Sequence, residues 1–176
     1  MHQDEPLVEA RIARLVRDRV DPAVLRRSAP VTIEAWEVPG EPVPFDAAVG
    51  ETYTPFTVGS HWGGRPWGTT WFRVTGTVPA DFGTAPGTTA ELLVDLGFTK
   101  RQPGFQAEGL AFRADGSTIK AIEPRNDTVP LEVGPGESFE LWIEAGANPD
   151  IGGDSFQGAT PLGSRSPRES TSSCPP

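Results

Sequence analysis

The sequence predicts a mainly β protein: a jelly-roll or galactose-binding-like antiparallel β-sandwich, preceded by a short helical segment and followed by a disordered tail. Its 176 residues include 20 glycines and 19 prolines, which lie between short apolar runs and so favour many short strands over long helices. Residues 71–78 and 139–145 alternate apolar and polar side chains, the period of a strand with one buried face. Nine Phe and five Trp can fill the core of one domain.

Residues 1–30 are predicted to form a helical preface. Residues 5–20 carry apolar side chains at three- and four-residue spacing among charged ones, which is typical of an amphipathic helix. Asp4 is the expected N-cap, with a proline just inside the start. Asp21, again followed by proline, predicts a second short helix through Arg27. The arginines are interpreted as a solvated face rather than a binding patch. The apolar positions are Val8, Ile12, Leu15, Val16 and Val20.

Residues 31–156 are predicted to form the β-sandwich accessory domain. Residues 41–56 are broken by prolines and are expected to wrap the sheet. Pro130 makes its strand an edge strand, because proline has no N–H to donate to a neighbour. Asp115, followed by glycine, predicts a type I′ hairpin turn. The predicted strands cover residues 31–38, 71–78, 92–96, 109–113, 119–123, 128–133 and 139–145.

The alternation assigns side chains of two strands to faces of the sheet. Trp71 and Phe72 are adjacent in the sequence, so they lie on opposite faces. In residues 139–145 the apolar side chains point inward, and Trp142 is left on the outer face. An outward tryptophan between two inward apolar residues makes Trp142 a candidate for a contact with another domain.

Residues 157–176 are rich in Gly, Ser, Pro, Thr and Arg and have few apolar side chains. Such a segment buries too little surface to offset the entropy of ordering, so we expect it to be disordered. Two interpretations stay open: a flexible linker or terminus, and the product of a shifted reading frame in a truncated gene. Cys174, the single cysteine, excludes an intramolecular disulfide framework.

Charge limits the classes of partner. The net charge of −9 and the pI near 4.7 repel phosphates, which argues against nucleic acid and against anionic membranes. No apolar run reaches the roughly 20 residues that cross a bilayer. The N-terminus is acidic and leads into an arginine-rich helix, unlike a secretory signal. We therefore expect a cytoplasmic protein.

An ordered set of motifs resembles a known enzyme family. Residues 67–79 read WGTTWFRVTGTVP, residues 104–110 read GFQAEGL, and residues 124–126 and 148–149 read PRN and NP. Together they resemble the region ahead of the catalytic domain in family 38 glycoside hydrolases, the class II alpha-mannosidases of the cytosolic and vacuolar type. The resemblance covers roughly residues 31–150. It implies an N-terminal β-sandwich that leans on a catalytic domain, in a chain that stops before that domain begins.

Family 38 enzymes are retaining mannosidases that use an Asp nucleophile, an acid/base carboxylate and a zinc ion held by His and Asp. Retaining cleavage needs two carboxylates about 5 Å apart. This chain has only His2 and His61, and neither lies in a His-x-His-x-Asp motif. No catalytic or metal-binding residue carries over to this sequence. The resemblance therefore implies that zinc belongs to the absent catalytic domain, with no cofactor in this fragment.

Binding residues are easier to nominate. Trp62, Trp67 and Trp71 lie within ten residues and beside several glycines. An indole stacks on the apolar face of a sugar ring, while amides and carboxylates bind its hydroxyls. Three interpretations stay open: contact with carbohydrate, contact with the absent domain, and burial in the core. The full set of candidates adds Gln106, Glu108, Asn126 and Trp142 to the three tryptophans.

Glu108 is the most site-like carboxylate, although it is more simply explained as a loop residue bonded to nearby backbone. The sequence thus predicts an accessory or scaffold domain of an alpha-mannosidase, inactive as this fragment. Its expected partners are the missing catalytic domain or its own copies, through surface that truncation leaves exposed. The alternatives are a free-standing carbohydrate-binding module that holds a glycan on a Trp-rich loop, and a small enzyme in its own right.

Overall fold

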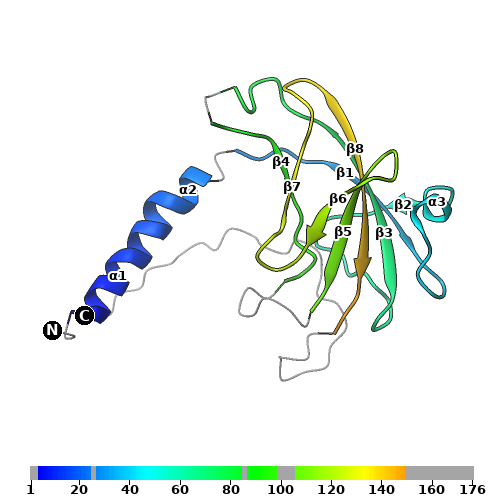
Figure 1. The fold of residues 1–176 in the computed structure, drawn as a ribbon, viewed down its shortest axis with the longest axis horizontal. Helices are drawn as coiled ribbons and strands as arrows, with labels where there is room; N and C mark the ends of the chain where they lie inside the picture. The colour runs from blue at the N-terminus through cyan, green and yellow to red at the C-terminus, as the bar shows by residue number, and fades with distance from the viewer. Residues whose placement is uncertain (1–3, 25–26, 85–86, 99–105, 150–176) are drawn as a thin grey trace. The chain divides into compact units, whose positions relative to one another are not determined.

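The computed structural model describes residues 4–24, 27–84, 87–98 and 106–149 (Figure 1). The predicted tail at 157–176, with Cys174, lies outside these ranges, as does His2. The chain divides into two compact units, residues 1–30 and 31–176. No helix in the described part is long and apolar enough to cross a membrane.

In the first unit, residues 5–24 form one continuous helix, made of α1 (Glu5–Leu15), η1 (Val16–Val20) and α2 (Asp21–Val24). Two sequence-based expectations are wrong in detail. Asp4 precedes the helix but its side chain makes no capping hydrogen bond, because its backbone is already near-helical at φ −96° and ψ −5°. α2 does begin at Asp21, but it is not a separate helix: the Asp21 N–H donates to the Val16 carbonyl, five residues back, so a π-turn joins α2 to the helix before it. The predicted end at Arg27 lies beyond a gap in the described residues.

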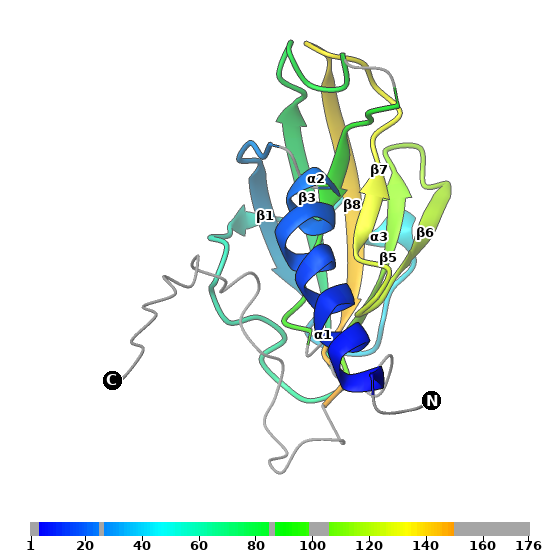
Figure 2. The same ribbon diagram turned by 90° about the vertical axis from the view of Figure 1, so that its left-hand side faces the viewer.

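The second unit is a sandwich of two antiparallel sheets. The large sheet has six strands in the order β2-β1-β3-β8-β5-β6, and the small sheet pairs β4 with β7. The small sheet lies on one side of the large one and helix α3 (Phe45–Ala48) on the other (Figures 1 and 2). The strands are β1 (Thr32–Glu37), β2 (Thr54–Pro55), β3 (Thr69–Thr77), β4 (Glu91–Leu93), β5 (Glu108–Arg113), β6 (Thr118–Ile122), β7 (Thr128–Pro130) and β8 (Ser138–Gly146).

All seven predicted strands are present, and β2 is an additional short one. β7 ends at Pro130, which has no N–H to continue the ladder, and it pairs only with β4. The strand predicted at 92–96 ends as a strand at Leu93. Just beyond it, Asp95 turns the chain by accepting hydrogen bonds from the N–H groups of Gly97 and Phe98, at 3.0 and 2.9 Å.

The large sheet packs against one core cluster on each face. On the first face, Phe72 and Leu141 of the large sheet pack with Leu92 and Val129 of the small sheet in one core cluster. On the second face, Trp71 and its neighbours form another cluster. The predicted separation of Trp71 from Phe72 is confirmed.

The proline-broken segment 41–56 was expected to wrap the sheet, and its residues 43–53 pack on the second face. The segment then continues into edge strand β2, and Phe56 packs on the first face. The Phe45 ring lies 6.0 Å from the Trp71 ring and 6.1 Å from the Trp142 ring, and the Tyr53 ring lies 5.2 Å from the Trp142 ring. Trp142 does face away from the first core, as expected. It is only 6 % exposed, however, because Phe45 and Tyr53 cover it. The expectation of an outer, uncovered Trp142 is therefore wrong.

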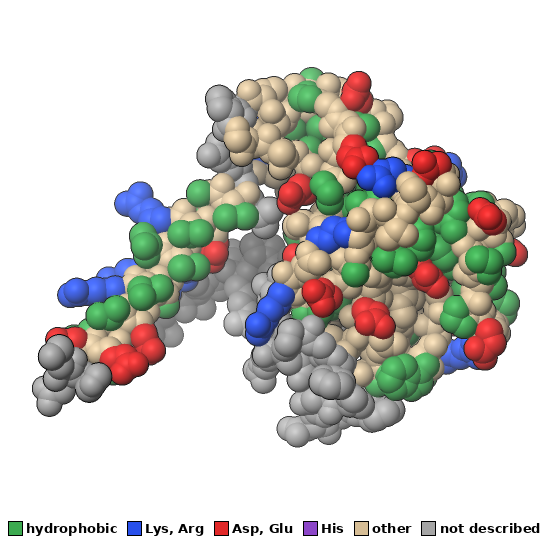
Figure 3. Space-filling model, in the orientation of Figure 1, with side chains coloured by type: hydrophobic (Ala, Val, Ile, Leu, Met, Phe, Trp, Pro, Cys, Tyr) green, Lys and Arg blue, Asp and Glu red, His purple; other side chains and the backbone are tan. Residues whose placement is uncertain are grey.

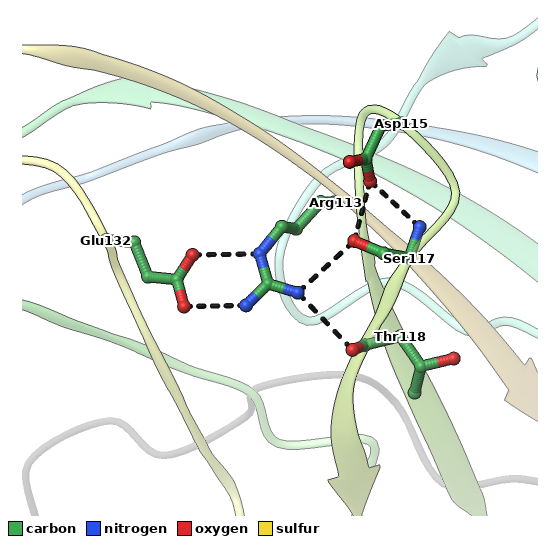
Figure 4. Close-up of polar contacts among 5 residues, drawn as sticks. All are labelled: Arg113, Asp115, Ser117, Thr118 and Glu132. Carbon is green, nitrogen blue, oxygen red and sulfur yellow. Dashed lines mark hydrogen bonds and ion pairs between the residues drawn. The ribbon is translucent and has the colours of Figure 1, made fainter.

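The hairpin between β5 and β6 has a different turn from the predicted type I′. Gly116 is left-handed at φ 82°, but Asp115 is not, and a type I′ turn needs both. The Asp115 carboxylate instead accepts hydrogen bonds from the backbone N–H and the hydroxyl of Ser117, at 2.9 and 2.6 Å (Figure 4). Beside it, the Arg113 guanidinium makes two hydrogen bonds to Glu132, at 2.8 and 2.6 Å, which tie the hairpin to the chain after β7.

Candidate functional site

Trp62 anchors the loop between β2 and β3 to the core. It is 4 % exposed, its Nε1–H donates to the Leu96 carbonyl at 3.3 Å, and its ring stands edge-on to Phe72 at 5.7 Å. An indole held in this way has neither a free face nor a free N–H for a ligand. Of the three open interpretations, core burial is the one that the geometry of Trp62 matches.

Trp71 lies on β3 and is completely buried in the second cluster, with the Phe112 ring 5.4 Å away. Its Nε1–H has no hydrogen-bond partner in the part of the chain that the structure describes. Trp71 and Trp142 both belong to this covered cluster. The structure therefore does not bring Trp62, Trp67 and Trp71 together on one surface.

Trp67 differs from the other tryptophan candidates. Its side chain is 63 % exposed, and its backbone has φ 65°, which makes it the one described non-glycine residue in the left-handed region. Its N–H donates to the Ala147 carbonyl at 2.9 Å, and the Ala147 N–H donates to the Gly68 carbonyl at 2.8 Å. These two bonds extend the pairing of β3 with β8 past the strand ends. They fix an exposed indole at one end of the large sheet.

Gly146, the last residue of β8, lies at this same end. It pairs with Thr69 on one side and with Glu108 on the other. A Cβ on Gly146 would lie 3.4 Å from the Asn148 Oδ1, and the Asn148 Nδ2 donates to the Glu108 Oε1 at 3.0 Å. Gly146, which has no side chain, is thus bordered by the amide of Asn148 and the carboxylate of Glu108. Glu108 is a strand residue bonded to a side chain, and the expectation of a loop residue bonded to backbone is wrong.

Glu144 adds a second carboxylate two residues before Gly146 on the same face of β8. It pairs with Trp71 on one side and Leu110 on the other, and it is half-buried among these apolar neighbours. Burial raises the pKa of the Glu144 carboxyl above its usual value. We call the set of Trp67, Glu108, Glu144, Gly146 and Asn148 the Gly146 end of the sheet.

The chemistry of the Gly146 end is that of binding. An exposed indole offers an apolar face, the amide donates and accepts, and the carboxylates accept hydrogen bonds from hydroxyl or guanidinium groups. In the described ranges no group of three or more His, Cys, Asp and Glu side chains is placed to hold a metal ion. The zinc expected in a catalytic domain stays a prediction.

The remaining candidates lie around this end or away from it. Gln106 is buried just before β5 begins. Asn126 lies in the turn beyond β6, the outer strand, where its amide donates to the Ala121 carbonyl at 3.4 Å and accepts from the Lys120 ammonium. His61 is exposed. Asn126 is thus engaged at the sheet edge and is not part of the Gly146 end.

Sequence reasoning nominated Trp67 and Glu108 but missed Glu144 as a site residue. The apolar–polar alternation of β8 placed Glu144 on the outer face of the sheet, where a glutamate is common. The signal that could have found it is Gly146, because a glycine inside a strand pattern marks a place where another group approaches the backbone closely.

A family model described as "Alpha-mannosidase, jelly roll domain" matches residues 29–168. The match covers every strand of the two sheets and ends inside the segment 157–176. No curated protein matches the chain.

Proposed function

Because the chain belongs to the alpha-mannosidase jelly roll domain family, we propose that it acts as an N-terminal accessory domain of an alpha-mannosidase and is catalytically silent alone. The match confirms the resemblance that the motifs at 67–79 indicated, and it confirms the jelly-roll fold class. In this proposal the domain supports a catalytic domain that supplies the reacting carboxylates and the zinc. Its cytoplasmic location stays a prediction.

Trp67 carries the proposal. A bulky residue in the left-handed region costs about 1–3 kcal/mol, and strain of this kind gathers at functional sites. The two backbone bonds to Ala147 hold Trp67 in that conformation while its indole stays largely in water. Aromatic side chains are enriched in interfaces between proteins. We therefore propose that the Gly146 end is the surface on which the domain contacts its catalytic partner.

A second function is favoured by the neighbours of Trp67. The Glu108–Asn148 pair supplies a carboxylate and an amide at the same end of the sheet as an exposed indole. Sugar binding uses these two kinds of group together, because an indole stacks on the apolar face of a pyranose while amides and carboxylates bind its hydroxyls. In this alternative the Gly146 end binds a glycan by itself, with Trp67 in place of the buried Trp62 and Trp71.

The first experiment is turnover of an aryl alpha-mannoside by the purified 176-residue chain, with and without added zinc. The accessory role predicts no turnover in either condition. Turnover that co-purifies with the chain through several steps, and that disappears in a variant of a carboxylate such as Glu144→Gln, would refute it. The inactive result leaves both binding functions open, so a binding experiment follows.

The second experiment is calorimetric titration of mannose and mannosides into the chain and into the variant Trp67→Ala. Leu93→Ala is the matched control, since Leu93 is also about half exposed but lies on β4 in the other sheet. Heat of binding that is lost in Trp67→Ala and kept in Leu93→Ala would support the glycan alternative. Absence of heat in all three proteins would leave the docking role as the better account of Trp67.

A further inference from the structure

The helix of the first unit exposes a continuous apolar face. Its seven large apolar side chains are between 41 % and 71 % exposed, and none of its described residues is buried. Figure 3 shows apolar side chains following one another along this helix. Contiguous exposed apolar surface of this kind marks an interaction site. The residues are Leu7, Val8, Ile12, Leu15, Val16, Val20 and Val24.

The π-turn keeps this face straight. Five of the apolar residues recur every four positions, from Val8 to Val24. In an α-helix each four-residue step turns about 40° beyond a full circle, so five such residues would wind well around the helix. The bond from the Asp21 N–H to the Val16 carbonyl spans five residues, so this turn holds more residues and rotates less per residue. The slower rotation over residues 16–20 keeps Val20 close to the face on which Val16 lies.

Charge is segregated along the same helix. Residues 4–9 hold Asp4, Glu5 and Glu9, a charge of −3. Residues 10–20 hold four arginines and Asp18, and four positive charges less one negative charge give +3. In Figure 3 acidic side chains gather near the N-terminal end and basic ones project farther along. Two such helices lying antiparallel place each acidic end beside a basic one, whereas two parallel helices place like charges together.

We propose that this helix pairs with the same helix of a second copy of the chain, antiparallel, through the face from Val8 to Val24. An isolated helix of this length is marginal in water, because its nucleation is costly and its own bonds barely offset the entropy of ordering. Pairing supplies the burial that stabilises it. The pair holds two chains together whether or not the Gly146 end binds a catalytic domain.

Sedimentation of the full chain over a range of concentrations tests the proposal. We expect a dimer that forms with rising concentration, accompanied by a rise in the helical circular dichroism signal. Ile12→Asp places a charge in the centre of the face and is expected to weaken dimerisation at least about tenfold, which is 1.4 kcal/mol. Ala10→Asp adds the same charge on the opposite side of the helix, two residues or about 200° away, and is expected to leave dimerisation nearly unchanged.

Folding of the variants can be checked separately, because all five tryptophans lie in the second unit. An unchanged fluorescence spectrum shows that the sandwich is intact in Ile12→Asp. A monomer at every concentration, or an equal loss in Ile12→Asp and Ala10→Asp, would overturn the proposal. Binding of a monomeric chain to anionic lipid vesicles through the same helix would overturn it as well.

A charge exchange tests the antiparallel arrangement. One double variant, Glu5→Arg with Glu9→Arg, makes both ends of the helix basic, and another, Arg14→Glu with Arg17→Glu, makes the basic end acidic. Each is expected to dimerise more weakly than the natural chain, and an equimolar mixture is expected to recover the dimer as a mixed pair. If the helix instead docked on the acidic sandwich of another copy, the mixture would not recover it, and the helix pair would be wrong.

Discussion

The left-handed backbone of Trp67 leads to a comparison of two variants, Trp67→Gly and Trp67→Ala. Both remove the indole and its contacts, so the difference between them depends on the Cβ. A left-handed residue with a Cβ costs about 1–2 kcal/mol, which alanine keeps and glycine loses. Glycine gives up about 0.5–1 kcal/mol through its greater freedom in the unfolded chain. The balance favours Trp67→Gly over Trp67→Ala by about 0.5–1 kcal/mol.

Urea unfolding followed by the fluorescence of the remaining tryptophans measures this difference. With a slope of roughly 1–3 kcal/mol per molar urea, the midpoint of Trp67→Gly should lie a few tenths of a molar above that of Trp67→Ala. The slopes should agree, because both variants expose the same surface on unfolding. Equal midpoints, or a higher midpoint for Trp67→Ala, would refute the left-handed conformation and with it the strain on which the proposed function depends.

Three further perturbations test the sandwich. Phe45→Ala uncovers the second cluster and should lower the free energy of unfolding by about 2–4 kcal/mol. The loss is smaller than for a fully buried aromatic because Phe45 is half-buried. Leu93→Ala, at an exposed position, is the control in the same urea titration. Gly116→Ala should cost about 1–2 kcal/mol, since φ is 82° and the new Cβ would lie 2.9 Å from the Phe45 Cδ1; an unchanged urea midpoint would contradict that turn. Glu144→Gln should stabilise the protein at neutral pH but not below pH 4.5. The pKa of Glu144 is raised in the folded state, so the unfolded chain ionises first and the stability of the natural protein falls as pH rises above 4.5. Urea midpoints that differ equally at all pH values would exclude ionisation of Glu144 as the cause.

Much of the fold could be predicted because strands leave a local trace. The two-residue alternation around Phe72 located β3 and separated its faces, and prolines marked where the chain crosses the sheet. What lies over each face depends on long-range packing. Trp142 was predicted to be uncovered because no residue in its own strand indicates the packing of Phe45 and Tyr53, which come from a segment about ninety positions earlier.

The candidate site was predictable only in part, for the same reason. A tryptophan beside glycines suggests exposure equally at Trp62 and Trp67, and local sequence does not distinguish them. The Leu96 carbonyl, which binds the Trp62 indole, lies 34 residues further along. The prediction of a type I′ turn was wrong because the Asp115 carboxylate accepts a hydrogen bond from Ser117 instead. An Asp-Gly pair is compatible both with that hydrogen bond and with a left-handed aspartate, so the sequence alone does not distinguish them.

The position of β8 has a consequence for the order in which the domain can assemble. β8 is the last strand of the described residues, yet it lies in the middle of the large sheet, between β3 and β5. Until it is synthesised, β2-β1-β3 and β5-β6 are separate fragments, each with an unpaired strand edge that can capture other chains. Pairing then joins residues far apart in sequence, which slows folding. A chain that ends before residue 138 therefore has two half-sheets with nothing to join them, and the large sheet is completed only when the nine residues of β8 are present.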